Sequence, residues 1–386
     1  MTHLRHRAKD PVKAATYCKA RMRLPLAALQ DLLRHSSAAM RRHRKTPGTW
    51  LGLRAFLTEG SSTLTPDTPA LRKEFGQPEG QKPGRGFPIC TLLGLFDAFT
   101  GRVVEALRLE LYTHEPSKVG KPHPLLGPGD VLVGDRGFCS YVHLTMLHLR
   151  GIFGLFRMHP QPIVDCRPHR KMHKKGQKGK PRSKFIKRLD QHDPIVEWRK
   201  PGRKPKWMEQ EPYDALPASL RVRALRFRLP RQGQRTLGVT LATTLLDPVL
   251  YSQAQIAALF KVRWQVETHF GELKTTPRMR QVKSHTVEGV RKELAIDARV
   301  YNRVHAARVE AAARQQTTPD RISFIDAVRW LLSAEPGETL AERIIHPPRP
   351  DRHEPRVVKH RRDSYQLMTR PRSELRKELK PQTIEN

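Results

Sequence analysis

The stretch from Ser252 to Lys274, which reads SQAQIAALFKVRWQVETHFGELK, combines a carboxylate with two cations at helical spacing. At about 100° per residue, Arg263, Glu267 and Lys274 fall in one narrow arc together with Phe260. A helix with these side chains along its edge can hold a carboxylate over a site. The same spacing fits an amphipathic surface helix with an Arg–Glu pair four residues apart, which is common. On spacing alone, the surface helix is the better interpretation.

The same stretch is expected to form a single helix that packs on a core. Ser252 and Gln255 have the types and spacing of a capping box, and no Pro or Gly interrupts the run before Gly271. Five apolar side chains share one face of the helical wheel. They are Leu259, Val262, Val266, Phe270 and Leu273.

Arg263, Glu267 and Lys274 also reproduce the R-x3-E-x6-K signature of the IS4-type transposases. The strings TTLLDP at 243–248 and RWQVETHFGELK resemble that family beyond the signature. The family places a Tyr three residues before the Arg, where this chain has Phe260. The resemblance implies that Glu267 is a catalytic carboxylate and that Arg263 and Lys274 contact DNA phosphates. Phe260 can then pack near the DNA but cannot donate a hydrogen bond.

Asp135 is the expected second carboxylate. It follows a short apolar strand expected at 131–133, and the string GDRGF is similar to the second-Asp motif of the same family. An Asp at this position can instead cap the next helix. The resemblance favours a metal ligand, and it places Arg136 where it can approach phosphate.

The first carboxylate departs from the family pattern. Relatives carry Asp-Gly-Thr or Asp-Gly-Ser at the end of the first strand, whereas this chain reads TEGSSTLTPDTP and has Glu59 in that slot. The extra methylene moves the carboxylate by roughly 1 Å, and misplacement on that scale can lower a rate about a hundredfold. Asp67 and Asp97 are alternatives, but a turn-forming role is the simpler interpretation of each. The expected catalytic residues and metal ligands are Glu59, Asp135 and Glu267.

Three carboxylates suit metal-dependent cleavage of phosphodiesters. A strand hairpin, a strand that ends in Asp and then helices is the element order of a ribonuclease-H-like fold, in which acids from two strand ends and one helix meet. Mg2+ prefers hard oxygen ligands that leave positions open for water and phosphate. We therefore expect Mg2+ as the cofactor, with Mn2+ as a substitute.

The remaining elements must position these residues. Apolar runs predict strands at 51–58, 89–96, 103–112, 131–133, 151–156, 220–229 and 236–244, and helical periodicity predicts helices at 141–149 and 287–313. The expected fold class is α/β, with a ribonuclease-H-like catalytic domain, a largely β insertion subdomain and a helical N-terminal segment. An insertion is needed because Asp135 and Glu267 lie too far apart for a bare strand-to-helix link.

The expected domain organisation has five parts. A helical segment at 1–50 represents a shortened DNA-binding region, and the catalytic domain is divided between 51–158 and 241–320. A basic, β-rich insertion occupies 159–240, and a basic tail occupies 321–386. Within the insertion, the block 167–188 has many Lys and Arg and no acid before Leu189. It is expected to be either a solvated loop or an arm that follows phosphates.

The composition points to a polyanionic partner. The chain of 386 residues has 72 Lys and Arg against 37 Asp and Glu, a formal net charge of +35. Double-stranded DNA is the expected partner of such a charge. The spacing of the four cysteines argues against a zinc site and a disulfide framework. No run predicts a membrane span or a signal peptide, so a cytoplasmic, nucleoid-associated protein is expected.

These observations favour a DNA transposase that cuts at element ends and transfers the strands to a target. A homodimer on DNA is implied by the resemblance. The main alternative is a decayed or repurposed copy that binds DNA without cutting it, which Glu59, Phe260 and the short N-terminal region favour. A ribonuclease-H-like nuclease that is not a recombinase is a third hypothesis, and the R-x3-E-x6-K signature argues against it.

Overall fold

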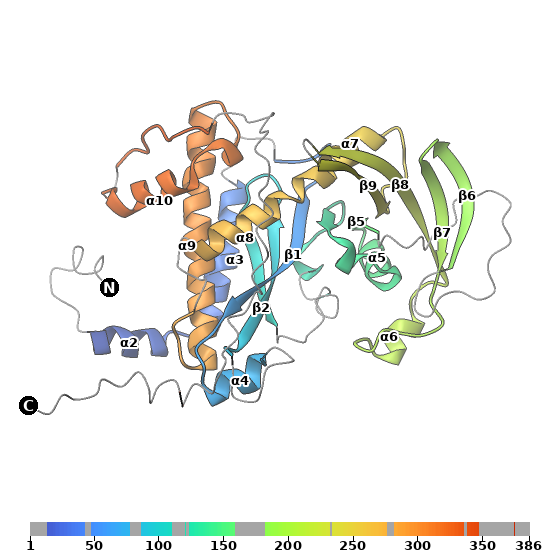
Figure 1. The fold of residues 1–386 in the computed structure, drawn as a ribbon. Helices are drawn as coiled ribbons and strands as arrows, with labels where there is room; N and C mark the ends of the chain where they lie inside the picture. Colours follow the sequence, from blue (N-terminus) through green and yellow to red (C-terminus); the bar gives the residue numbers. More distant parts are fainter. Residues whose placement is uncertain are drawn as a thin grey trace, which may run out of the picture.

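The structure is a computed structural model that describes residues 14–42, 48–77, 86–109, 120, 123–158, 182–231, 234–275, 282–335, 338–346 and 374. The described chain begins and ends with helices, its strands and a few helices lie between them, and the helices pack on a large sheet (Figure 1). The α/β class expected from the sequence is confirmed.

The described strands form one nine-stranded sheet in the order β3-β2-β1-β4-β5-β9-β8-β7-β6. β1 pairs antiparallel with β2 and parallel with β4, which is parallel to β5. The strands are β1 (Ala55–Leu64), β2 (Ile89–Asp97), β3 (Val103–Leu109), β4 (Val131–Gly134), β5 (Phe153–Arg157), β6 (Arg182–Asp190), β7 (Asp193–Arg199), β8 (Ser219–Arg231) and β9 (Gln234–Thr243).

Helices cover both faces of this sheet. The helices are α2 (Ala14–Arg23), α3 (Leu26–Arg42), α4 (Pro69–Phe75), α5 (Tyr141–His148), α6 (Gln210–Asp214), α7 (Gln253–Val262), α8 (Gln265–Thr275), α9 (Val287–Arg314) and α10 (Phe324–Ser333), with 3-10 turns η2 (His123–Leu125), η3 (Arg136–Phe138) and η4 (Pro319–Arg321). α3, α4, α7, α8 and α9 pack on one face, and α5 and α6 pack on the other. In Figure 1, α7 and α8 run across the sheet from β9 toward the long helix α9, and α8 lies against α9.

The central strands are buried on both sides, which follows from their sequences. Along β1, Ala55 and Leu57 join the core under α7 to α9, whereas Phe56 joins the core under α5. Strands covered by helices on both faces carry nearly continuous apolar runs. We refer to the face under α7, α8 and α9 as the α8 face.

The first strand differs from its expected range. It begins at Ala55, because Trp50 and Leu53 form a tight bridge before it, and it continues to Leu64. The strand was expected to end at residue 58, but the polar residues after Glu59 also pair with β2, from Gly60↔Leu93 to Leu64↔Ile89. Backbone pairing with β2 therefore outweighs the low strand propensity of the Gly and Ser residues there.

The insertion continues the sheet of the preceding strands. β9 pairs antiparallel with β5, and β8, β7 and β6 follow outward. Arg223 on β8 lies buried between Asp193 at the start of β7 and the Tyr251 carbonyl, to which it donates at 2.6 Å. Of the basic block 167–188, residues 182–188 belong to β6, and the rest lies outside the described residues.

Candidate active site

Two of the predicted carboxylates come from neighbouring parallel strands. The last pair between β1 and β4 is Thr58↔Gly134, and Glu59 and Asp135 are the next residues on each strand. Glu59 has the same parity as Leu57, so the alternation of strand side chains directs it to the α8 face. Asp135 follows Val133, which also lies on that face. The sheet therefore brings Glu59 and Asp135 to one edge.

The side chain of Asp135 is not used to cap the turn that follows. Asp135 occupies the N-cap position of η3, but its carboxylate makes no capping hydrogen bond. Its Oδ1 atom is buried without a hydrogen-bond partner and lies 3.9 Å from Nη1 of Arg157. The helix-capping interpretation of Asp135 is therefore not supported by its contacts.

The expected single helix at 252–274 is wrong in one respect, because it breaks at Arg263 and Trp264. The Ser252–Gln255 capping box is present, α7 ends at Val262, and α8 begins at Gln265. Across the break, amides bond to carbonyls three residues earlier, as in Arg263 N to Phe260 O at 3.1 Å and Val266 N to Arg263 O at 3.0 Å. This is the tighter 3-10 pattern.

Arg263, at this break, joins two of the predicted carboxylates. Its Nη1 donates to Oε2 of Glu59 at 2.9 Å, and its Nη2 lies 3.6 Å from Oε1 of Glu267. The Arg263 side chain is 6% exposed, whereas that of Glu267 is 66% exposed. A buried guanidinium therefore lies between a strand carboxylate and a helix carboxylate, and the helix carboxylate remains open to solvent.

Among the described residues, the three carboxylates do not form a group whose ligand atoms all lie within 4.8 Å of one another. Glu59 and Glu267 pair with Arg263, and Asp135 pairs with Arg157. In the described part of the chain, the acidic or histidine side chains whose ligand atoms all lie within 4.8 Å belong to a different cluster. Arg157 was not among the site residues expected from the sequence. Its place directly after Phe156, at the end of the strand next to β4, is the signal that identifies it.

The remaining predicted residues divide between surface and core. Arg136 is exposed in η3 and Lys274 is half-buried on α8. Phe260 is 1% exposed and lies in the core with Arg263 over its ring at 5.8 Å. The structure therefore does not present Phe260 on a DNA-facing surface, because its position on α7 points toward the sheet.

The two alternative acids have local roles. Oδ1 of Asp97 accepts hydrogen bonds from the amides of Phe99 and Thr100 in the β2–β3 turn. Asp67 pairs with Arg72 through two hydrogen bonds of 2.6 and 3.0 Å. Asp97 is thus a turn-forming residue, as the simpler interpretation predicted. The contacts of Asp67 and Asp97 are local, so Glu59 is still the expected first carboxylate.

Comparison with protein families gives an assignment. A family model described as a transposase DDE domain matches residues 52–303, a range that contains Glu59, Asp135 and Glu267 and more than half of the chain. The chain belongs to this family. The similarity to DDE transposases that the signature at 263–274 implied is confirmed, and the chain is a transposase-family protein.

Comparison with solved structures adds a distant neighbour. The chain is similar to the cryo-EM structure of the piggyBac transposase synaptic complex with hairpin DNA, with a TM-score of 0.35 and 10% sequence identity over 72% of this chain. The match spans 51% of that chain, and a likeness of this size carries no argument about the site. A comparison with curated proteins gives no match. Within the described residues, no helix is long and apolar enough to cross a membrane.

Proposed function

We propose that this protein is an IS4-type transposase that cleaves DNA at the ends of its element and joins those ends to a target. The observation that carries the proposal is the in-register placement of Glu59 and Asp135 on adjacent strands, with Arg263 joining Glu59 to Glu267. In this proposal, hydrolysis releases a 3′-hydroxyl at the element end. That hydroxyl then attacks a target phosphodiester and displaces the target's own 3′ oxygen.

The strand order supports a ribonuclease-H-like catalytic domain. The strands β3-β2-β1-β4-β5 consist of an antiparallel β1–β2–β3 meander followed by two strands parallel to β1. Such a sheet brings an acid on β1 close to an acid that directly follows β4, and a helix that packs on the same face supplies the third acid. α8 occupies that place and carries Glu267 in its first turn.

The donor set at this edge fits Mg2+. All three side chains offer carboxylate oxygens, the ligands that Mg2+ prefers, and Oδ1 of Asp135 is a buried acceptor without a hydrogen-bond partner. When bound by Glu59, Asp135 and Glu267, Mg2+ supplies the Lewis acidity that activates water and stabilises the leaving oxygen.

The cations around the site suit phosphate. Arg263 carries a planar guanidinium that can contact a phosphate through two hydrogen bonds, and Lys274 offers a point charge on the same helix. Exposed Arg136 extends the positive surface beside Asp135. With a net charge of +35, the chain is suited to DNA, and binding as a homodimer would present two such sites to two element ends.

The test is metal-dependent cleavage of DNA that carries the repeats flanking the gene. Wild type, Glu59→Asp, Asp135→Ala and Glu267→Ala are compared with Mg2+ or Mn2+, and Glu310→Gln, which removes an exposed carboxylate from α9, is the control. We expect Asp135→Ala and Glu267→Ala to abolish cleavage while salt-sensitive DNA binding persists. Undiminished cleavage by either variant contradicts the assigned site.

Cleavage by wild type and by Glu59→Asp distinguishes an active transposase from a decayed copy. If wild type cuts, Glu59 is an acceptable ligand and the transposase proposal stands. If Glu59→Asp cuts and wild type does not, the chain is a transposase disabled at one carboxylate. If neither cuts and both bind DNA, the protein is a DNA-binding descendant of a transposase.

A further inference from the structure

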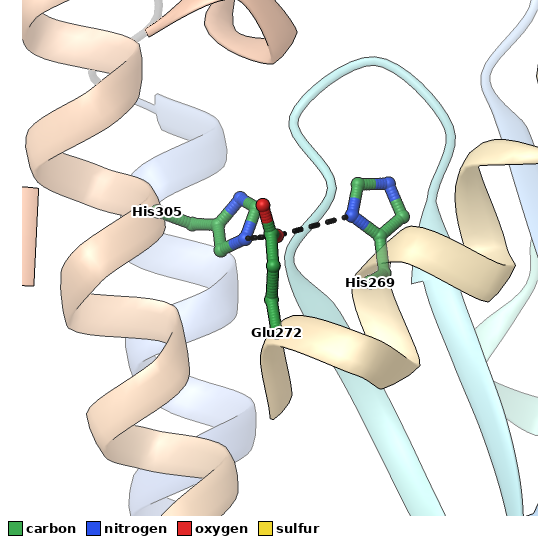
Figure 2. A group of neighbouring side chains, drawn as sticks. All are labelled: His269, Glu272 and His305. Carbon is green, nitrogen blue, oxygen red and sulfur yellow. Dashed lines mark hydrogen bonds and ion pairs between the residues drawn. The ribbon is translucent and has the colours of Figure 1, made fainter. Parts of the chain in front are cut away.

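A second cluster of ionisable side chains lies on another face of α8. His269 and Glu272 come from α8, and His305 comes from the neighbouring helix α9 (Figure 2). At 100° per residue, Glu272 and His269 lie about 140° and 200° around the helix from Glu267. This cluster is therefore separate from the predicted catalytic carboxylates.

The three side chains have the spacing of metal ligands. Oε2 of Glu272 lies 3.2 Å from Nε2 of His305 and 3.8 Å from Nδ1 of His269, and one ligand atom from each residue falls within 4.8 Å of the others. Tetrahedral Zn2+ with bonds of about 2.0–2.1 Å places its ligand atoms about 3.4 Å apart. The cluster is within a few tenths of an ångström of that spacing on two sides.

The two ring nitrogens of His305 have different surroundings: Nδ1 contacts a backbone carbonyl, and Nε2 faces Glu272 and Arg308. Its Nδ1 lies 2.9 Å from the carbonyl oxygen of Thr100, which can only accept, so Nδ1 carries the proton. In a neutral imidazole with its proton on Nδ1, the other nitrogen, Nε2, carries the free lone pair. Its Nε2 then directs a lone pair toward Oε2 of Glu272. Two lone pairs that face each other at 3.2 Å are stabilised by a cation between them.

His269 is a buried polar side chain without a hydrogen-bond partner. It is 6% exposed, it stacks on Phe96 at 5.7 Å, and neither ring nitrogen makes a hydrogen bond. Its distance of 3.8 Å from Glu272 is too long for a hydrogen bond. Buried polar groups in native proteins are almost always paired. An unpaired imidazole that faces a carboxylate therefore indicates that a ligand, such as a metal ion, binds between the two side chains.

We propose that His269, Glu272 and His305 bind a transition-metal dication, Zn2+ foremost, that fixes α8 to α9. Two imidazoles and a carboxylate form a donor set that suits Zn2+, whereas Mg2+ prefers oxygen ligands alone. A cavity of about 880 Å3, lined in part by His269, Glu272 and Arg308, opens beside the cluster and gives the metal an entry path and room for a water ligand. The cysteine spacing argued against a zinc site, but this one uses no cysteine.

Arg308 is the neighbour that opposes a dication. Its Nη1 lies 3.2 Å from both oxygens of Glu272 and 3.4 Å from Nε2 of His305. The positive charge of Arg308, whose Nη1 donates to both carboxylate oxygens, favours the ionised form of Glu272. The carboxylate is therefore ionised and ready to ligate. A plain Glu272–Arg308 ion pair explains these contacts but leaves both nitrogens of His269 unsatisfied.

The experiment uses full-length protein stripped of metal and titrated with Co2+ in excess Mg2+. Tetrahedral Co2+ bound by imidazole gives visible d–d absorption, and added Zn2+ should displace it. His269→Phe keeps a ring that can stack on Phe96 and removes the ligand. We expect wild type to bind one equivalent, and His269→Phe to bind at least about a hundredfold more weakly, because loss of outer partners alone costs 10–100-fold.

Two controls separate this site from its surroundings. Glu267→Ala removes the predicted catalytic carboxylate, and His346→Gln changes another histidine of the same cavity. Both should keep the wild-type Co2+ spectrum. Circular dichroism checks that His269→Phe is folded, and His269→Asn replaces it if not. A wild-type protein without the tetrahedral spectrum, or a folded His269 variant that keeps it, overturns the proposal.

Discussion

Arg263 is the residue on which the proposed active site depends most directly. It is nearly buried, it contacts Glu59 and Glu267 at the same time, and it belongs to the signature that marks the family. Its charge compensates the negative charges of these two carboxylates, which would otherwise repel each other.

A conservative substitution tests this role. In Arg263→Lys the charge remains, but an ammonium cannot span two carboxylates as the planar fork does. We expect metal-dependent cleavage to fall at least about tenfold, which corresponds to about 1.4 kcal/mol in the barrier. For DNA binding, the slope of the logarithm of the association constant against the logarithm of the salt concentration should change by less than about one unit, because the positive charge is kept.

The matched control is Lys261→Gln on α7, which removes an exposed cation two residues away. Its cleavage rate should stay within about twofold of wild type, the usual range for surface changes. Equal rates for Arg263→Lys and wild type would show that bridging by Arg263 does not matter for cutting.

At the scale of elements, α8 determines how the site is assembled. Its apolar residues Val266, Phe270 and Leu273 are buried on the sheet, and Glu267 projects from its first turn. Gly94 on β2 lies opposite Glu59 and makes this close packing possible. A Cβ atom at Gly94 would lie 2.8 Å from the ring of Phe270 and 2.4 Å from the ring of Phe96.

Gly94→Ala should therefore move α8 away from the sheet. Overpacking of this kind typically lowers the free energy of unfolding by about 1–3 kcal/mol. Thermal unfolding measures that loss, and cleavage should fall further because Glu267 is displaced. The control is Gly271→Ala in α8, where a Cβ meets nothing within 4 Å. It should stabilise the protein by about 0.5–1 kcal/mol. Equal unfolding temperatures for both variants would contradict this account.

The elements also show how far the sequence could be interpreted. The hairpin, the strand before Asp135 and the helix after Thr286 were predictable, because each has a clear apolar period or turn. The break at Arg263 was not, because the apolar period continues through it and the tightened turn accompanies contacts with distant Glu59. The cluster of His269, Glu272 and His305 has no motif at all. It exists because α8 packs against α9, a contact that local sequence does not specify.

At the scale of the whole molecule, stability should depend on pH through buried histidines. His123 in η2 and His143 in α5 stack at 5.1 Å, and their Nε2 atoms lie 3.0 Å apart. Burial, as the main cause, lowers the pKa of His123 to about 3 and that of His143 to about 4. Unfolding returns both to about 6.5, so the unfolded chain binds more protons below that pH. The free energy of unfolding should therefore fall as the pH decreases from 6.5 toward 4.

Chemical denaturation at pH 6.5 and at pH 5 measures this dependence. His123→Gln removes one of the two titrating histidines. Between pH 6.5 and pH 5, the free energy of unfolding of this variant should therefore fall by about 1–2 kcal/mol less than that of wild type. His148→Gln, an exposed histidine on α5, is the control and should behave as wild type. A wild-type loss that matches His123→Gln would show that His123 does not titrate on unfolding.

The pairing of β5 with β9 has a consequence for synthesis on the ribosome. One edge of β5 is hydrogen-bonded to β4. The other edge pairs with residues 241–243 of β9, which the ribosome makes much later than β5. Until β9 emerges, the growing chain carries an unpaired strand edge, which is a template for wrong pairings. Closing so long a loop is slow, because its entropy must be lost before the new hydrogen bonds form. The residues between β5 and β9 therefore determine when, during translation, β5 can gain its second neighbour.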